Sequence, residues 1–435
     1  LIADDLGWGD VGFHNSEIRT PNIDKFSREG IILDRFYTSP ICSPTRAALL
    51  TGRYPNRYGI RNNVIRPWLD FGLDTTEKLL PKVLDDAGYK NRAVVGKWHL
   101  GHSRKEYHPL HRGFTHFYGH LNGAIDYFNF TREGERDWHE GYDSSSDTGY
   151  TTDLITSKAI EYIKKFNEDN SPFFIQVAYN APHSPLQAKK EYLLEYGFDE
   201  SQPRFRQGRG IGNTKRQTYS AMVTHMDDGI GDILNALKEQ GITENTLVLF
   251  LSDNGAETRY GGSSGELRGK KLTEWEGGVR VPAIVKWPSG FLDAGWKSNQ
   301  LMGCIDIFPT IISIVNPEYK SKKMLDGINI LPILNDSSKE IKRDIFIGNG
   351  VLINNQWKFI KANSINPRMK NIEDLLFEIN QDPSETNNVL SRHQNIYFEM
   401  DTMLEKYESM KSSYPPPSDK RPKSFVPPEN WKIQN

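Results

Sequence analysis

The chain has 435 residues, of which 37% are hydrophobic and 25% are charged, and its formal net charge is -2. These values are typical of a globular protein and exclude a disordered or fibrous chain. A charge close to zero gives no basis for binding nucleic acid or an anionic membrane, so an anionic substrate would be held by local basic groups. No apolar stretch approaches the roughly 20 residues of a membrane span. The two cysteines, Cys42 and Cys304, exclude a disulfide scaffold but not a single bridge.

Four apolar runs of strand length are each followed at once by polar residues. The runs cover residues 1–3, 92–95, 173–179 and 247–251, and they precede Asp4-Asp5, Gly96-Lys97-Trp98-His99, Asn180-Ala181-Pro182-His183 and Ser252-Asp253-Asn254-Gly255. Continuous apolar runs are typical of strands covered on both faces, as in a mostly parallel sheet. The first run has the character of a strand end, so we expect any signal peptide to lie upstream of Leu1, and the sequence is silent on the compartment.

Helical periodicity lies between these runs. Residues 151–166 and 219–240 carry apolar side chains at helical spacing, and Gly241 is a residue type favoured just after a helix. The alternation of strands and helices predicts a doubly wound α/β fold with helices on both faces of the sheet. Ligands of such sheets bind beyond the carboxyl ends of the strands, and all four polar clusters lie at such ends.

The pattern changes near residue 341, and we expect a large α/β domain over residues 1–340 and a small α+β subdomain over residues 341–435. Short antiparallel strands are predicted at residues 345–347, 351–353 and 357–361, and a helix near residues 394–410. The tail from Ser412 contains Pro415-Pro416-Pro417, Pro422, Pro427 and Pro428, which predicts an extended strap.

Cys42 opens the sequence Cys-Ser-Pro-Thr-Arg-Ala-Ala-Leu-Leu-Thr-Gly, which predicts a short helix. Ser43 is expected as its N-cap, Pro44 suits the first turn, and Gly52 can end it. Cys42 would then lie at a helix N-terminus, where backbone N–H groups favour an anion, with Arg46 one turn further on the same face. An equally simple interpretation is a buried structural cysteine, with Arg46 in a surface salt bridge.

Asp4, Asp5, Asp253 and Asn254 form a second group of candidate residues. They offer oxygen ligands from two strand ends, the set that Ca²⁺ prefers. Either pair by itself is explained as well by capping or a turn, but two pairs beside an anion site favour a metal. Zinc is the alternative, because six histidines follow closely in the sequence, but zinc sites need three or four nitrogen or sulfur ligands. These histidines are His99, His102, His108, His111, His116 and His120.

The third group is basic and comprises Arg46, Lys97, His99, His183 and Lys271. Charge-assisted hydrogen bonds can hold the oxygens of an anion, and an imidazole or ammonium can protonate a leaving oxygen. Taken singly, a surface lysine or a hydrogen-bonded buried histidine is the commoner situation. His99 and His183, however, directly follow apolar strands at their carboxyl ends.

These motifs together resemble the sulfatase family. Residues 42–46 are similar to its Cys-x-Pro-x-Arg signature, and residues 1–10, 51–55, 96–101, 267–271 and 275–280 match further motifs in family order. The likeness runs from residue 1 to near residue 390. It implies an alkaline-phosphatase-like fold and hydrolysis of sulfate esters.

The resemblance also implies a role for each candidate residue. Cys42, converted to formylglycine by an installing enzyme, would hold one Ca²⁺ together with Asp4, Asp5, Asp253 and Asn254. One hydroxyl of the hydrated aldehyde would attack sulfur, and His183 or Lys271 would protonate the leaving oxygen. His99 would deprotonate the second hydroxyl to expel sulfate, while Arg46 and Lys97 stabilise the diol and the transferring group. The spacing of five residues to Glu276 selects Lys271 over Lys270.

Within the family, residues 112–127, 148–152 and 182–187 resemble arylsulfatase B, an N-acetylgalactosamine-4-sulfatase. This likeness implies an exo-acting enzyme for sulfated glycans in a periplasmic, secreted or lysosomal-type compartment. His102, Arg104, Asp126 and Tyr127 are candidates for substrate contacts, with plain loop packing as the equal alternative. Neither the sugar nor the oligomeric state follows from the sequence.

Two other functions compete with this interpretation. A phosphomonoester or phosphodiester hydrolase of the same superfamily would typically carry Ser or Thr at the nucleophile and bind two zinc ions, unlike Cys42 and its acidic pairs. An inactive protein that only binds sulfated glycans would be expected to have lost one of the six candidate catalytic residues. All six are present, and they are Cys42, Arg46, Lys97, His99, His183 and Lys271.

Overall fold

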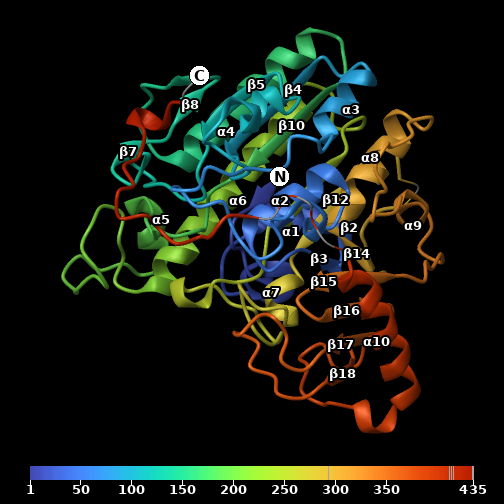
Figure 1. The fold of residues 1–435 in the computed structure, drawn as a ribbon. Coiled ribbons are helices and arrows are strands. Elements are labelled where there is room, and N and C mark those ends of the chain that lie inside the picture. Colours follow the sequence, from blue (N-terminus) through green and yellow to red (C-terminus); the bar gives the residue numbers. More distant parts are fainter. Residues whose placement is uncertain (292, 411, 413, 415, 434–435) are drawn as a thin grey trace.

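A ten-stranded sheet forms the centre of the molecule in the computed structural model, which describes residues 1–435 except 292, 411, 413, 415 and 434–435 (Figure 1). Its strands are β1 (Ile2–Ala3), β2 (Ile31–Leu33), β4 (Asn91–Lys97), β5 (His116–His120), β8 (His139–Glu140), β9 (Asp143–Ser144), β10 (Phe173–Ala178), β11 (Val248–Ser252), β12 (Ala283–Lys286) and β13 (Trp296–Ser298). They lie in the order β13-β2-β12-β11-β1-β10-β4-β5-β8-β9. The central strands from β11 to β5 are parallel, as the continuous apolar runs predict.

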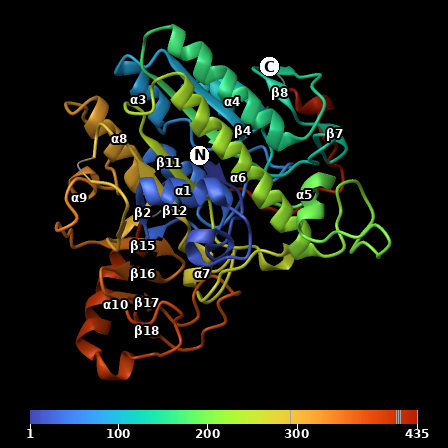
Figure 2. The ribbon, with the colours of Figure 1, turned by 180° about the vertical axis from the view of Figure 1, so that it is seen from behind.

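Helices cover both faces of this sheet, which confirms the predicted doubly wound fold. Helices α1 (Pro21–Glu29), α4 (Thr151–Glu168) and α6 (Lys215–Glu239) pack on one face, and α2 (Cys42–Thr51), α3 (Leu80–Asp86) and α8 (Ile307–Val315) pack on the other (Figures 1 and 2). Successive strand residues point to opposite faces, so Ile2 packs in the core under α2 while Ala3 packs in the core under α4 and α6. The parallel strands therefore have no face in water.

Short elements complete this part of the chain. They are β3 (Phe36–Tyr37), β6 (Thr131–Arg132), β7 (Glu135–Arg136), β14 (Met302–Gly303), α5 (Lys190–Glu195), α7 (Glu276–Val279) and α9 (Leu331–Leu334). Strands β6 and β7 form an antiparallel hairpin, and β14 pairs with β3.

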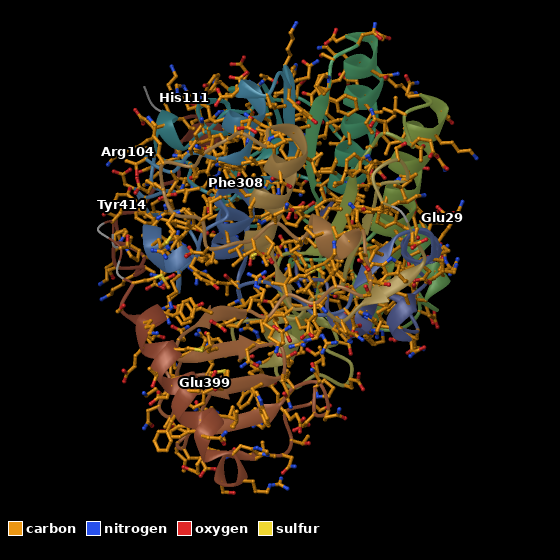
Figure 3. All side chains as sticks on the ribbon, turned by 90° about the vertical axis from the view of Figure 1, so that its right-hand side faces the viewer. Glu29, Arg104, His111, Phe308, Glu399 and Tyr414 are labelled. Atoms are coloured by element: carbon orange, nitrogen blue, oxygen red, sulfur yellow. The ribbon has the colours of Figure 1, made fainter. Side chains whose placement is uncertain are left out.

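A second, antiparallel sheet follows in the order β15-β16-β17-β18, with β15 (Asp344–Gly348), β16 (Val351–Asn354), β17 (Trp357–Ile360) and β18 (Leu375–Glu378). Helix α10 (Gln394–Glu408) packs on it and turns Glu399 outward, away from the sheet (Figure 3). The first three strands and the helix match the prediction. Strand β18 was not predicted, because it has only four residues and lies between long polar loops.

The proline-rich tail is extended, as its composition predicts, although Pro415 falls outside the described residues. Residues 416–433, which we call the strap, contain no strand, and the short 3-10 helix Glu429–Trp431 is their one helical turn. Figure 1 shows the strap as a red trace that runs back over the large sheet to the β6–β7 hairpin. Trp431 anchors its far end, where its side chain is 1% exposed.

Candidate active site

Four neighbouring strand ends bring the predicted polar clusters together. Strands β11, β1, β10 and β4 are adjacent and parallel, so their carboxyl ends share one edge of the sheet. The backbone beyond the strands stays joined, since the amide of Asp253 donates to the carbonyl of Ala3 and the amide of Asp4 donates to that of Ala181. Residues that are far apart in the sequence, such as Ala3 and Asp253, therefore become neighbours.

Cys42 is the first residue of helix α2, at this same edge. The helix ends at Gly52, whose φ of 68° is the left-handed C-cap that the sequence predicts. The predicted N-cap role of Ser43 is wrong, because Ile41 occupies the N-cap and no side chain caps the helix. The hydroxyl of Ser43 instead donates to the carbonyl of His99 and accepts from the amide of Ile65. Ser43 thus ties the helix start to two loops of the site.

The sulfur of Cys42 lies among side chains from three other segments. Its Sγ is 3.5 Å from Asp4 Oδ1, 3.3 Å from Asn254 Oδ1 and 3.4 Å from Lys271 Nζ. The residue is 1% exposed. Burial, followed by the nearby carboxylate of Asp253, raises the pKa of the thiol to about 12. An unmodified thiol here is protonated at neutral pH and is a poor nucleophile.

The acidic residues converge as predicted for a metal site. The Nδ2 group of Asn254 donates to Asp5 Oδ1 at 2.8 Å, and the amide of Asp5 lies 3.3 Å from Asp253 Oδ1. One potential ligand atom from each of four residues lies within 4.8 Å of the others, and these residues are Asp4, Asp5, Cys42 and His183. Asp4 and Asp5, together with Asp253 and Asn254, offer oxygen atoms, and these fit a hard cation such as Ca²⁺ better than zinc.

Three cationic side chains neutralise these carboxylates. Lys97 donates to Asp4 Oδ2 at 2.5 Å, Lys271 donates to Asp5 Oδ1 at 2.5 Å, and Arg46 binds Asp253 Oδ2 through Nε and an Nη at 3.0 and 2.8 Å. The Arg46 guanidinium also donates to the carbonyl of Lys97 at 3.0 Å. All three cations are buried. The alternative of a surface salt bridge for Arg46 is therefore wrong.

The pKa shifts of the paired groups follow from these contacts. Burial would raise the pKa of Asp5, but the ammonium of Lys271 lowers it well below its usual range. Burial and the charge of Asp4 raise the pKa of Asp253. Burial opposes the charge on Lys271, yet Asp5 and its neighbours raise the pKa of the ammonium well above its usual value. Lys271 therefore holds its proton beside the Cys42 sulfur.

His99 lies directly after β4 in a left-handed backbone conformation, with φ of 58°, which is rare for a residue with a side chain. Its Nε2 lies 3.2 Å from the carbonyl of Ile65, so Nε2 carries the hydrogen and Nδ1 is an acceptor. Nδ1 is buried and has no hydrogen-bond partner among the described residues. Burial and the charges of Lys97 and Arg46 lower the pKa of His99 well below its usual value, so the ring is neutral. It can accept a proton at Nδ1.

His183 follows β10 and faces the acidic group. Its Nδ1 donates to the carbonyl of Ser184 at 2.6 Å, and its Nε2 lies 3.6 Å from Asp5 Oδ2. Burial lowers its pKa to about 3. The hydroxyl of Tyr127 donates to the carbonyls of Asn180 and His183, at 2.6 and 2.7 Å, and so holds this loop in place.

The four candidates for substrate contacts lie outside this cluster. His102 is buried and bonded to the carbonyl of Pro67 at 2.9 Å, while Arg104 is exposed and paired with Asp70. Asp126 accepts hydrogen bonds from two backbone amides and from the side chain of Gln187. The hydroxyl of Tyr127 binds carbonyl groups in the loop that contains His183. The role of these residues in substrate binding stays a prediction.

The histidines of the zinc alternative do not converge. His108 stacks on Tyr142, and His116 packs against Tyr162 and Phe166. Among the residues that the structure describes, the one group with metal-binding geometry is the acidic cluster at Cys42. A cavity at the amino ends of β10 and β11 is also unrelated to this chemistry, because it is lined mainly by apolar side chains.

Two features of the site were missed from the sequence. The loop at residues 65–67 contacts both Ser43 and His99, although no chemical motif marks it. Asn180 directly follows β10, and both its buried amide atoms lack hydrogen-bond partners among the described residues. Its position after an apolar run is the sequence signal that marks Asn180, like the nearby His183, as a candidate site residue.

With this geometry in place, comparison with known proteins identifies the family. The family model described as "Sulfatase" matches residues 1–317. The chain belongs to the sulfatase family. It is 37% identical to the N-acetylgalactosamine-6-sulfatase of Homo sapiens over 359 residues, which cover 77% of this chain and 65% of that protein. It is 35% identical to the arylsulfatase J of Mus musculus over 353 residues, which cover 79% of this chain and 56% of that protein.

The chain thus spans 56% to 65% of the length of these curated sulfatases. Solved structures match over more of their length. The crystal structure of Ps i-CgsB has a TM-score of 0.84 and 30% sequence identity, and the match covers 95% of this chain and 93% of that one. A further structure of Ps i-CgsB, in complex with k-i-k-neocarrahexaose, has a TM-score of 0.83 with the same identity, covering 95% of this chain and 92% of that one. The fold is the alkaline-phosphatase-like fold that the sequence resemblance implies.

Proposed function

We propose that this sulfatase hydrolyses sulfate esters of a sulfated glycan. The observation that carries the proposal is the set of side chains around Cys42, in which Arg46, Lys97 and Lys271 all lie at one buried edge of the sheet with the acidic residues. Charge-assisted hydrogen bonds from such cations suit the oxygens of a bound sulfate. The Ps i-CgsB structure with a carrageenan-type oligosaccharide supports a glycan as the substrate class.

We propose that Cys42 is converted to formylglycine by an installing enzyme during maturation, which replaces its –CH₂SH group with an aldehyde. The hydrated aldehyde supplies one hydroxyl to attack sulfur and a second whose deprotonation releases sulfate. Position 42 suits this role because it lies at the start of α2, where free backbone N–H groups favour developing negative charge.

We assign one Ca²⁺ to Asp4, Asp5, Asp253, Asn254 and the modified Cys42. Their oxygen-rich chemistry and their convergence support this choice, and the ion would act as a Lewis acid toward the sulfate and the nucleophile. The other residues act through protons and charge. His99 accepts a proton at its free Nδ1, since the ring is neutral and Nε2 is bonded to Ile65.

The leaving oxygen of the sugar needs a proton, and two residues are placed to supply it. Lys271 is protonated and lies at Cys42, whereas His183, which faces the same group from the end of β10, carries its hydrogen on Nδ1 and would first have to be protonated at Nε2. Arg46 and Lys97 pair with the carboxylates of Asp253 and Asp4, and so place two further positive charges in the site. Cys42 is 1% exposed, so a protruding terminal sulfate reaches it more readily than one within a chain, which favours exo action.

A compartment where sulfated polysaccharides are degraded suits this function, and we propose a periplasmic, secreted or lysosomal-type location. No helix of the described residues is long and apolar enough to cross a membrane.

Two measurements test the proposed function. Peptide mass spectrometry across residues 35–53, on protein made in a host that installs formylglycine, should show the aldehyde in place of the Cys42 thiol. Sulfate release from an aryl sulfate and from a panel of sulfated oligosaccharides should then accompany the aldehyde form. A fully unmodified thiol, or an aldehyde-bearing protein that binds these glycans without releasing sulfate, would contradict the proposal.

A further inference from the structure

The strap joins the β6–β7 hairpin to the loop at residues 65–68, which contacts Ser43 and His99 of the candidate active site. The indole of Trp68 donates to the carbonyl of Asp419 at 2.8 Å, and the indole of Trp431 donates to the carbonyl of Arg132 at 2.9 Å. The amide of Asn430 also donates to Glu135 at 3.0 Å. The strap is therefore held at both ends, by the loop that contains Trp68 and by the β6–β7 hairpin.

This arrangement is connected directly to Cys42. The loop at residues 65–67 begins with Ile65, which bonds both Ser43 in α2 and His99. Two residues later, the carbonyl of Pro67 accepts from His102, and the His102 ring packs edge-on against Trp431 with centroids 5.3 Å apart. Arg66 lies between these anchor points and is exposed. The strap and the start of α2 thus share one short connecting loop.

An excess of positive charge gathers around the strap. Glu133 lies between two arginines, because its Oε2 is 2.9 Å from Arg421 and its Oε1 is 3.7 Å from Arg132. The Arg421 guanidinium also lies over the Trp68 ring, 5.6 Å from its centroid. With Arg66, two residues before Trp68, the group contains three guanidinium groups and one carboxylate. We call Arg66, Arg132, Glu133 and Arg421 the strap cluster.

The charges in the strap cluster are not fully balanced. The Nε of Arg132 is buried and has no hydrogen-bond partner among the described residues. Burial, together with the charges of Arg66 and Arg421, lowers the pKa of Arg132 despite the nearby Glu133. A bound anion would supply negative charge and hydrogen-bond acceptors to the exposed guanidinium groups of Arg66 and Arg421. Guanidinium groups suit this task, since their planar donors match the oxygens of a sulfate or carboxylate.

We propose that the strap cluster is a subsite for a second anionic group on the glycan, carried by a sugar beside the one whose sulfate reaches Cys42. This inference rests on the proposed function and narrows its substrate to oligosaccharides with at least two anionic groups. The second group is a sulfate ester or a uronate carboxylate, which share the oxygen acceptors that arginine binds.

Binding by a protein without the nucleophile tests the subsite separately from turnover. The parent protein for all variants is the full chain with Cys42→Ala, in the presence of Ca²⁺. Calorimetry measures its binding of two ligands. They are a multiply sulfated carrageenan hexasaccharide and a chondroitin sulfate tetrasaccharide that also bears carboxylates. Arg66→Gln and Arg421→Gln are each added to this background. Lys423→Gln, an exposed change of the same charge on the strap, is the matched control.

We expect Arg66→Gln and Arg421→Gln each to weaken binding about tenfold, and Lys423→Gln to change it less than about twofold. Glu133→Gln should tighten binding, because it removes the negative charge inside the cluster. A loss with the carrageenan oligosaccharide would identify sulfate as the second group, and a loss confined to the chondroitin oligosaccharide would identify carboxylate. Equal effects of all three cation variants, or no effect of Arg66→Gln and Arg421→Gln on either ligand, would overturn the subsite. Absence of sulfate release by the unsubstituted chain would refute the hydrolase proposal but leave this binding result intact.

Discussion

At the scale of single residues, the side chain of Asp253 contacts two different parts of the candidate active site. Its Oδ2 accepts from Arg46, and its Oδ1 lies within reach of the Asp5 backbone amide. It is fully buried, so its charge is compensated by these contacts and by any bound cation. Removing that charge should therefore weaken metal binding and, because Arg46 is left buried without its anion, also lower the stability of the metal-free protein.

Asp253→Asn should abolish turnover and remove stabilisation by Ca²⁺, because an amide keeps the size of the carboxylate but not its charge. At a Ca²⁺ concentration about 100-fold above Kd, binding adds about 2.7 kcal/mol to the stability of the unsubstituted protein. Thermal unfolding with and without Ca²⁺ measures this directly. Asp336→Asn, a change in an exposed loop, is the control and should keep both the shift and the activity. A normal Ca²⁺ shift in Asp253→Asn would contradict the metal assignment.

Most residues of the candidate site could be predicted because each lies at the carboxyl end of an apolar strand or in the loop that follows it. Asp4, Lys97, His183 and Asp253 are of this kind, and one topological rule brings their strand ends together. The contacts of Ser43 could not be predicted, since they depend on loops whose paths the sequence does not indicate. The same holds for the left-handed φ of His99, which the surrounding structure imposes against local preference.

At the scale of elements, helix α2 carries Cys42, the proposed site of the nucleophile, and the C-terminus of the helix is fixed by Gly52. The backbone there has φ of 68°, and a Cβ atom would lie 3.0 Å from the side chain of Phe308 in α8. Gly241, after α6, has nearly the same φ of 69° but has nothing within 4 Å of such an atom. The two glycines therefore separate backbone strain from packing.

Gly241→Ala should cost about 1–2 kcal/mol of unfolding free energy, the usual penalty of left-handed backbone with a side chain. Gly52→Ala should cost more, because Phe308 must also move, and it should lower activity by displacing α2. Urea unfolding of both variants gives the comparison. Equal losses of stability would show that the contact with α8 adds nothing.

At the scale of the whole molecule, one buried lysine connects the two sheets. Lys358 in β17 lies 3.0 Å from Glu276 of α7 and 2.8 Å from Glu385, and all three side chains are fully buried. The sequence predicts both sheets but gives no sign of this contact, because Lys358 looks like an ordinary polar residue of a short strand. Its partners are 82 and 27 positions away in the sequence, and only folding brings them next to Lys358.

Lys358→Met should destabilise the protein by about 3–5 kcal/mol, since it leaves the buried carboxylate of Glu276 without its nearest cation. Lys361→Met is the matched control three residues later, where the lysine is partly exposed and pairs with Asp401. That exposed pair should contribute at most about 1 kcal/mol. Chemical denaturation measures the unfolding free energy that each variant loses. Similar losses would show that the buried group of Lys358, Glu276 and Glu385 stabilises the protein no more than the exposed pair does.

The same triad predicts how stability depends on pH. Burial, followed by the charge of Glu276, raises the pKa of Glu385 to about 7, whereas Lys358 and Arg280 overcome burial and lower the pKa of Glu276. Since the folded state holds a proton on Glu385 that the unfolded chain releases near pH 4.5, this group's contribution to stability is full below that pH and is lost as the pH rises to about 7.

Glu385→Gln removes this loss because the amide does not ionise. The stability of the variant relative to the unsubstituted protein should therefore rise between about pH 5 and pH 7.5, and titrating groups far from Glu385 cancel in the difference. Urea unfolding at several pH values measures it. A difference that stays constant with pH, or that falls, would mean that Glu385 is ionised in the folded protein and that Lys358 is shared by two carboxylates rather than by one carboxylate and one acid.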